Sequence, residues 1–156
     1  MGCIGEDNDM ENIQVMLVDD EVEFLNTLTK RLRKRGVDIK GVESGEKALE
    51  ALKEGHYDVI ILDVRMPGMD GIEVLRKIKD GYPLTEVIML TGHANVEVAV
   101  QGMELGAFDY LMKPMDIDEL LYKVEDAFKK KQIQEDKLDI LKQMSHSTEK
   151  ETAKNR

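Results

Sequence analysis

The sequence predicts an α/β fold, an open and doubly wound parallel sheet of five strands with helices on both faces. Short β-prone runs alternate with helical patterns along about 130 residues, without long gaps between them. The run at residues 59–62 is continuously apolar, as is typical of a parallel strand covered on both faces. Because crossovers between parallel strands are right-handed, this alternation leaves few other arrangements.

The first half of the chain alternates as follows. A strand is predicted at residues 15–18, and a helix at residues 22–35 has apolar Val22, Leu25, Leu28 and Leu32 at helical spacing. A second strand follows Gly36 at residues 37–42, and a second helix lies between its cap Ser44 and Gly55. The buried strand at residues 59–62 then delivers Asp63 at its carboxyl end.

The second half continues the alternation. Asp70 and Gly71 open a helix through residue 78, and a strand at residues 87–90 leads to Thr91. A helix at residues 95–105 ends at Gly106, and the fifth strand covers residues 108–112. The last helical pattern begins at Asp116 and continues without Pro or Gly to about residue 144.

Composition and charge limit the classes of function. A formal net charge of −10 and a pI near 4.8 disfavour direct binding to nucleic acid or to an anionic membrane. The single cysteine, Cys3, cannot form an intramolecular disulfide, and no apolar run approaches the roughly 20 residues of a membrane span. We therefore expect a cytoplasmic protein whose part in any nucleic-acid process is indirect.

The predicted organisation is a flexible N-terminus at residues 1–12, a domain at residues 13–129, and a helical extension with a disordered tail at residues 130–156. The tail is predicted to begin at Ser145 because the sequence becomes polar there. In the extension, Ile133, Ile140 and Met144 follow a heptad-like spacing that Lys137 interrupts. This pattern predicts a weak homodimer, or alternatively a solvated helix that belongs to a linker.

Polar residues follow the predicted strands at their carboxyl ends. Asp19 and Asp20 follow the first strand, Asp63 the third, Thr91 the fourth and Lys113 the fifth. Each alone has a commoner explanation as a helix cap or an exposed side chain. Because the carboxyl ends of parallel strands meet at one edge of the sheet, where ligands bind in such folds, their joint placement predicts a site.

The chemistry of this set indicates a divalent cation and a phosphoryl group. Three neighbouring carboxylates repel one another, by about 4 kcal/mol per pair at 4 Å, so they need protons or a cation. Oxygen ligands favour Mg²⁺ or Mn²⁺, which leaves positions open for phosphoryl oxygens. Lys113 and Thr91 can then contact the other phosphoryl oxygens, while one carboxylate serves as the nucleophile.

The sequence resembles the receiver domain of two-component response regulators. The resemblance rests on "VDDE" after the first strand, "ILDVRMPGMDG" at the third, "TGH" at the fourth and "FDYLMKP" at the fifth, in order over residues 14–129. The segment "TGHANVEVAVQGMELGAFDYLMKP" is similar to receivers of nitrogen-regulatory transcription activators. The resemblance implies a flavodoxin-like sheet and a phosphoacceptor signalling domain that is not an enzyme, although it assists its own phosphorylation and dephosphorylation.

The resemblance also implies residue roles. Asp63 is the expected phosphoacceptor, and Asp19, Asp20, Asp63 and the backbone carbonyl of Arg65 are the expected Mg²⁺ ligands. Thr91 and Lys113 are expected to bind the phosphoryl group, Thr91 and Tyr110 to switch on activation, and Lys113–Pro114 to be a cis peptide bond. The expected partners are a histidine kinase or phosphotransfer protein, and a downstream protein on the face of the fourth helix, fifth strand and fifth helix.

Two other functions use a similar fold. A phosphatase with an aspartyl nucleophile requires a second acidic residue two positions after the nucleophile, where this chain has Arg65. A flavodoxin-like cofactor binder requires Ser, Thr and Gly donors after the first strand, where Asp19, Asp20 and Glu21 would repel a phosphate. The sequence leaves open whether the receiver is a stand-alone protein or a fragment of a longer regulator.

Overall fold

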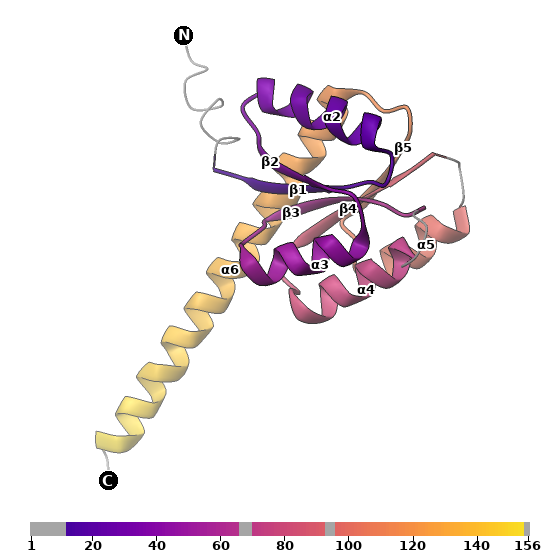
Figure 1. Ribbon diagram of the computed structural model, residues 1–156. Coiled ribbons are helices and arrows are strands. Elements are labelled where there is room, and N and C mark those ends of the chain that lie inside the picture. The colour runs from indigo at the N-terminus through magenta and orange to yellow at the C-terminus, as the bar shows by residue number, and fades with distance from the viewer. Residues whose placement is uncertain (1–11, 66–69, 93–95, 155–156) are drawn as a thin grey trace.

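The computed structural model describes residues 12–65, 70–92 and 96–154. Its sheet has five parallel strands in the order β2-β1-β3-β4-β5, which confirms the predicted fold class (Figure 1). The strands are β1 (Gln14–Val18), β2 (Asp38–Val42), β3 (Val59–Asp63), β4 (Glu86–Thr91) and β5 (Asp109–Met112). The helices are α2 (Val22–Lys34), α3 (Gly45–Glu54), α4 (Gly71–Gly81), α5 (Val96–Glu104) and α6 (Ile117–Lys154).

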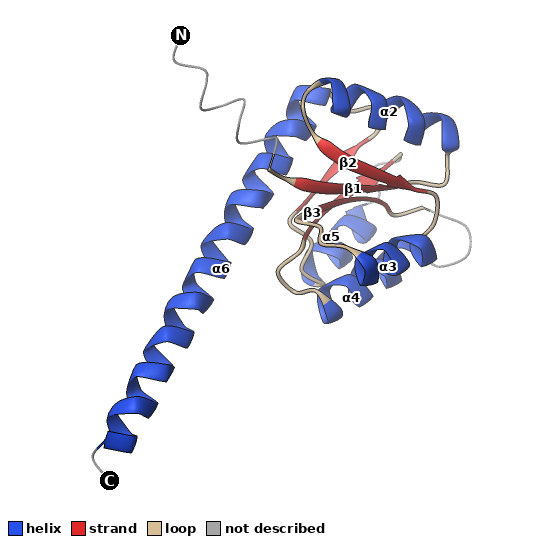
Figure 2. Ribbon diagram, turned by 60° about the vertical axis from the view of Figure 1, so that its left-hand side comes forward, coloured by secondary structure: helices blue, strands red, loops and turns tan. Residues whose placement is uncertain are grey.

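The sheet separates two apolar cores. On one face, α2 and α6 pack over the sheet, and on the other face α3, α4 and α5 do so (Figures 1 and 2). All five residues of β3 are buried, as expected for the central strand of a sheet with helices on both faces. Its rigid position in the middle of the molecule fixes where the residue at its carboxyl end lies.

Helix ends follow the signals in the sequence. The Ser44 hydroxyl accepts a hydrogen bond from the Lys47 N–H at 3.2 Å, and the Asp70 carboxylate accepts one from the Ile72 N–H at 3.1 Å. Gly36 and Gly106 have φ values of 87° and 103°, in the left-handed region that favours glycine after a helix. These caps confirm the predicted starts of α3 and α4 and the predicted ends of α2 and α5.

The apolar face predicted for α2 is wrong at its first residue. Val22 is 47% exposed because it stands at the very start of the helix, whereas Leu25, Leu28 and Leu32 are buried. Phe24, which the helical spacing did not select, packs against the core instead. The side chain of Phe24 therefore lies on the sheet side of α2.

Helix α6 is longer than predicted. It has 38 residues and continues beyond Met144 to Lys154, so the disordered tail predicted from Ser145 is replaced by helix within the described residues. No Pro or Gly interrupts this polar segment, and its Glu, Lys and Ala residues are good helix formers. Figure 2 shows the extension leaving the domain, with no other part of the chain beside it.

Two further expectations concern the N-terminal segment and membrane-spanning helices. The flexible segment predicted at residues 1–12 lies outside the described residues except for Asn12. In the part of the chain that is described, no helix combines the length and the apolar character that crossing a bilayer would require.

Candidate functional site

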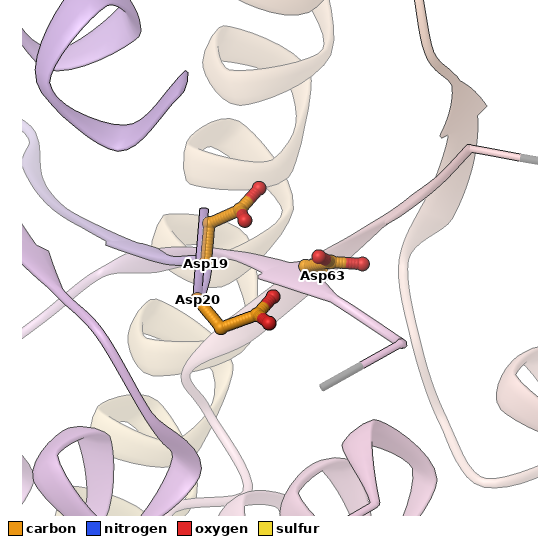
Figure 3. Close-up of side chains that lie close together, drawn as sticks. All are labelled: Asp19, Asp20 and Asp63. Carbon is orange, nitrogen blue, oxygen red and sulfur yellow. The ribbon is translucent and has the colours of Figure 1, made fainter. Parts of the chain in front are cut away.

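The three predicted aspartates meet at the carboxyl edge of the sheet. Asp19 and Asp20 directly follow β1, and Asp63 is the last residue of β3, the neighbour of β1. One carboxylate oxygen from each lies within 4.8 Å of the other two. Figure 3 shows the Asp20 and Asp63 side chains extending from the two chain segments toward a common space, with Asp19 beside them.

Backbone hydrogen bonds hold these carboxylates in place. The Glu21 N–H donates to Asp19 Oδ1 at 2.9 Å, and the Arg65 N–H donates to Asp63 Oδ1 at 3.0 Å. The ladder also continues beyond the strands, because the Asp19 N–H donates to the Val42 carbonyl at 3.1 Å. Asp19 and Asp63 are almost completely buried and Asp20 is partly exposed, so the cluster opens to solvent on the side of Asp20.

Lys113 supplies the positive charge of the site. It follows β5, and its Nζ donates to Asp19 Oδ2 at 2.7 Å and lies 3.6 Å from Asp63 Oδ2. The ammonium also lies 4.0 Å from the centre of the Phe24 ring, a distance at which a cation and an aromatic face attract each other. The peptide bond between Lys113 and Pro114 is cis, which confirms the expectation from the sequence.

The electrostatics of the cluster favour an added cation. Burial first, and then the charges of Asp19 and Asp20, raise the pKa of the Asp63 carboxyl to about 6, although the Arg65 N–H and Lys113 act in the opposite direction. Burial lowers the pKa of the Lys113 ammonium, but its hydrogen bond to Asp19 and the neighbouring carboxylates outweigh burial and raise this pKa. One lysine thus compensates only part of the negative charge of three carboxylates.

The donor set suits a hard divalent cation. All the candidate ligand atoms are carboxylate oxygens from Asp19, Asp20 and Asp63, and they are close enough to share one ion. Mg²⁺ prefers such ligands and keeps open positions when only a few carboxylates bind it. The residues present therefore fit the metal that the sequence predicts.

Thr91 and Tyr110 lie on the neighbouring strands. Thr91 is the buried last residue of β4, one position beyond Leu90, which is paired in register with Asp63 on β3, and Thr91 itself is paired with Met112 on β5. The Lys113 N–H donates to the Thr91 carbonyl at 2.7 Å, so the phosphoryl-binding pair predicted from sequence shares a backbone contact. Tyr110 is on β5, the edge strand that is separated from β3 by β4, and it is 43% exposed.

A glycine next to the site allows a close backbone approach. A Cβ atom added to Gly71 would lie 2.4 Å from the Cα atom of Val64, which directly follows Asp63. No side chain fits in that space without a shift of the backbone. The start of α4 is therefore packed tightly against the chain segment that carries the candidate nucleophile.

Two contacts of the site were missed by sequence reasoning. The Phe24 ring under Lys113 comes from α2, and nothing in the spacing of that helix indicates a partner so far along the chain. The Arg65 N–H bond to Asp63 was also missed, because the sequence suggested only the Arg65 carbonyl as a ligand. An aspartate followed two residues later by any residue with a backbone N–H permits this turn, so the sequence signal is weak.

Comparison with known proteins identifies the family. The family described as "Response regulator receiver domain" matches residues 15–125, which is most of the chain. The chain belongs to the response regulator receiver family. This receiver is 39% identical over 117 residues to the transcriptional regulatory protein ZraR of Escherichia coli K12, covering 75% of this chain and 26% of ZraR.

A second curated relative and a solved structure support the same family assignment. The receiver is 42% identical over 113 residues to the DNA-binding transcriptional regulator NtrC of Escherichia coli K12, covering 72% of this chain and 24% of NtrC. It thus spans about a quarter of the length of these curated relatives. A receiver domain structure from Clostridium thermocellum superposes with a TM-score of 0.74 at 32% identity, covering 78% of this chain and 98% of that one.

Neighbouring structures also include larger regulators. NtrX from Brucella abortus, solved in complex with ATP, superposes with a TM-score of 0.77 at 29% identity, covering 81% of this chain and 29% of NtrX. These comparisons establish a signalling receiver of a two-component response regulator. Phosphorylation and Mg²⁺ binding at an aspartate cluster are general properties of this family.

Proposed function

We propose that Asp63 is the residue of this receiver that accepts a phosphoryl group from a histidine kinase or phosphotransfer protein. The observation that carries the proposal is the position of its carboxylate, buried at the end of the central strand between two aspartates and Lys113. Neither rival function fits as well, because Arg65 follows at the position where an aspartyl phosphatase needs an acid, and acidic residues follow β1.

Asp19, Asp20 and Asp63 would hold Mg²⁺ or Mn²⁺, with the Arg65 carbonyl as a predicted further ligand. When bound, the metal neutralises charge on the carboxylates and on the phosphoryl oxygens. Asp19 is fully buried, and its carboxylate already accepts hydrogen bonds from the Glu21 N–H and from Lys113. Asp20 is the partly exposed ligand and the one through which the site exchanges with solvent.

The transfer itself is an in-line displacement at phosphorus. An ionised oxygen of Asp63 attacks, the bond between phosphorus and the donor atom breaks, and its electron pair leaves with the donor, giving an acyl phosphate. The Arg65 N–H orients the carboxylate during this step. Lys113 and Thr91 would then bind oxygens of the transferred group. The Lys113 Nζ already lies 3.6 Å from Asp63 Oδ2, so it would need to move only a short distance.

Phosphorylation of the chain with acetyl phosphate tests the assignment. We expect one added phosphoryl group by intact-mass measurement when Mg²⁺ is present and none after chelation of the metal. Asp63→Ala should remain unlabelled, while the control Asp80→Ala, an exposed carboxylate on α4, should label as the wild type does. Equal labelling of wild type and Asp63→Ala would refute the assignment.

The downstream partner is proposed to bind the face of α5, β5 and α6. This face carries exposed apolar side chains on all three elements, namely Val100, Met103, Tyr110, Met112 and Tyr122. Thr91 on β4 lies between Asp63 and β5, so movement of Thr91 toward a phosphoryl group can shift the position of Tyr110.

Beryllofluoride, which mimics the phosphoryl group, tests this route. We expect backbone amide shifts at residues 96–104 and at Tyr110 in the wild type, and much smaller shifts there in Thr91→Val. Shifts limited to residues 19–21 and 63–65 in the wild type would rule the route out.

A weak homodimer through the extension of α6 is the second partner proposal. It rests on exposed apolar residues beyond the domain, Ile133, Leu138, Ile140 and Leu141 among them.

Family membership is consistent with the cytoplasmic location predicted from the sequence, and the acidic net charge supports protein partners rather than nucleic acid or membrane.

A further inference from the structure

The second half of α2 forms a strongly basic surface on an acidic protein. Five of the six residues from position 30 to position 35 are cations: Lys30, Arg31, Arg33, Lys34 and Arg35. All are exposed, in a chain whose net charge is −10. The sequence therefore concentrates positive charge at the C-terminal end of α2, away from the aspartate cluster at the N-terminal end of this helix.

Only two of these cations have partners among the described residues. The Arg33 guanidinium donates to the Ile39 carbonyl at 3.0 Å, and Arg35 forms an ion pair with Asp118 at 2.7 Å. For Lys30, Arg31 and Lys34, the described part of the chain supplies no hydrogen bond and no ion pair. These three charges are available to an anionic partner.

An open groove lies beside these lysines. It has a volume of about 510 Å³ and is lined by Asn26, Thr29, Lys30, Arg33 and Lys34. Thr29 is only 7% exposed, and its hydroxyl has no hydrogen-bond partner within the described residues. The lining of the groove thus combines three cationic side chains with two polar ones.

The chain itself carries an acidic segment before β1. Residues 6–11 contain Glu6, Asp7, Asp9 and Glu11, and no basic residue occurs in the first twelve positions. The segment is attached through Asn12 to β1, whose first residue Gln14 pairs with Asp38 at the start of β2. The chain enters β2 directly after α2, where the Val37 N–H donates to the Leu32 carbonyl at 3.1 Å.

The acidic segment is long enough to span the groove. At no more than about 3.5 Å per residue, the stretch from Asn12 back to Glu6 reaches about 20 Å. The groove runs along α2 from Asn26 to Lys34, which is about 12 Å at 1.5 Å per residue. A tether this short gives an effective concentration in the millimolar range, so weak attraction suffices for occupancy.

We propose that the acidic segment at residues 6–11 docks on the basic groove of α2, with its carboxylates against Lys30, Arg31 and Lys34. The strongly negative net charge of the chain disfavours the competing anions, a nucleic acid or an anionic membrane, which it repels at long range. The segment needs no such approach, because it is covalently attached to β1, whose first residue Gln14 pairs with Asp38 just after α2. This contact is independent of phosphoryl transfer at Asp63.

Deletion of residues 1–11 tests the contact in an otherwise unchanged chain. We expect backbone amide shifts at residues 26–35 on deletion at low salt. The same residues should shift when salt is added to the full chain, because at about 0.5 M the Debye length falls to about 4 Å. Shifts confined to residues 12–15 and 38, next to the cut, would contradict the proposal.

Charge reversal supplies the matched control. In the double variant Lys30→Glu and Lys34→Glu, deletion of residues 1–11 should no longer shift residues 26–35. In Lys47→Glu and Lys53→Glu, two exposed lysines of α3 on the opposite face of the sheet, deletion should act as in the wild type. Equal deletion shifts in both double variants would overturn the proposal.

A peptide identifies the occupant. A synthetic peptide of residues 1–12 should bind the shortened chain and shift residues 26–35, and about tenfold more weakly when its four acids are replaced by Asn and Gln. If the amide peptide binds equally well, the contact is not ionic and the proposal fails. Tighter binding of a short DNA duplex than of the peptide would assign the groove to nucleic acid and also overturn it.

Discussion

At the scale of single residues, the site brings together three carboxylates that repel one another in the folded chain. Asp63 is buried beside Asp19 and Asp20, and it has one N–H donor and one ammonium in its vicinity. A carboxylate in this position is less stable than in water, which is why burial and the neighbouring charges raise its pKa to about 6. The same features that make Asp63 available to an electrophile therefore reduce the stability of the fold.

The raised pKa predicts a dependence of stability on pH. Between the ordinary value of 3.8 and about 6 the folded chain binds more protons than the unfolded chain, so the free energy of unfolding should fall as pH rises through this range. Asp63→Asn removes the effect. We expect this variant to be more stable than wild type at pH 7 by about 3 kcal/mol in the absence of metal, by urea denaturation.

Asp80→Asn is the control for this prediction, since Asp80 is exposed on α4. It should leave the free energy of unfolding almost unchanged. Adding Mg²⁺ should stabilise wild type more than Asp63→Asn, because the metal compensates the charge that the substitution removes. A free energy of unfolding for Asp63→Asn equal to that of wild type at pH 7 would show that burial and the charges of Asp19 and Asp20 do not destabilise the ionised Asp63 carboxylate.

At the scale of elements, α6 is fixed where it leaves the domain. Lys131 is only 3% exposed, and its ammonium lies 2.9 Å from Asp58 Oδ1 and contacts Glu135 on the next turn. Asp58 also accepts hydrogen bonds from the Gln14 N–H at 2.8 Å and contacts His56 at 3.0 Å. These contacts join α6 to the amino ends of β1 and β3, so the helix and the sheet are held together opposite the aspartate site.

The Lys131 contact should be important for stability. Lys131→Met leaves the Asp58 carboxylate buried without its cation, and we expect a loss of about 3 kcal/mol in the free energy of unfolding. Lys129→Met, which removes an exposed lysine 3.8 Å from Glu125, is the matched control and should cost less than about 0.5 kcal/mol. Urea denaturation at pH 7 measures both, and similar losses for the two variants would argue against a special role of Lys131.

At the scale of the whole molecule, the order of elements was predictable and several long-range contacts were not. The run at residues 59–62, the cap at Ser44 and the glycines at 36 and 106 are local signals, and the structure confirms what each predicts. Convergence of the aspartates followed from the geometry of parallel sheets. The Phe24 ring under Lys113 and the burial of Lys131 depend on packing between distant segments, which no local pattern encodes.

The end of α6 was mispredicted for a different reason. The polar composition after Ser145 predicts disorder, yet polar residues with high helix propensity continue a helix when no Pro or Gly interrupts it. Helices of this kind gain little from propensity alone, and packing against a partner usually contributes most of their stability. The extension therefore raises the question of what it packs against.

A second copy of the chain is the partner that the spacing of the extension favours. Ile133, Lys137, Ile140 and Met144 succeed one another at intervals of four, three and four residues, which places them along one seam of a two-stranded coiled coil. Leu141 lies beside this seam, and it is exposed in the single chain, as are Ile133 and Ile140. Two heptads with a lysine in the seam can support only weak pairing.

Sedimentation of the full chain measures the pairing. We expect wild type to associate at high micromolar concentration, the double variant Ile133→Gln and Ile140→Gln to remain monomeric, and Lys137→Leu to associate more tightly because a charge leaves the seam. Lys142→Gln changes the opposite side of the helix and should behave as wild type. If wild type stays monomeric at these concentrations, with or without beryllofluoride, or if Lys137→Leu associates no more tightly, then the seam does not join two copies.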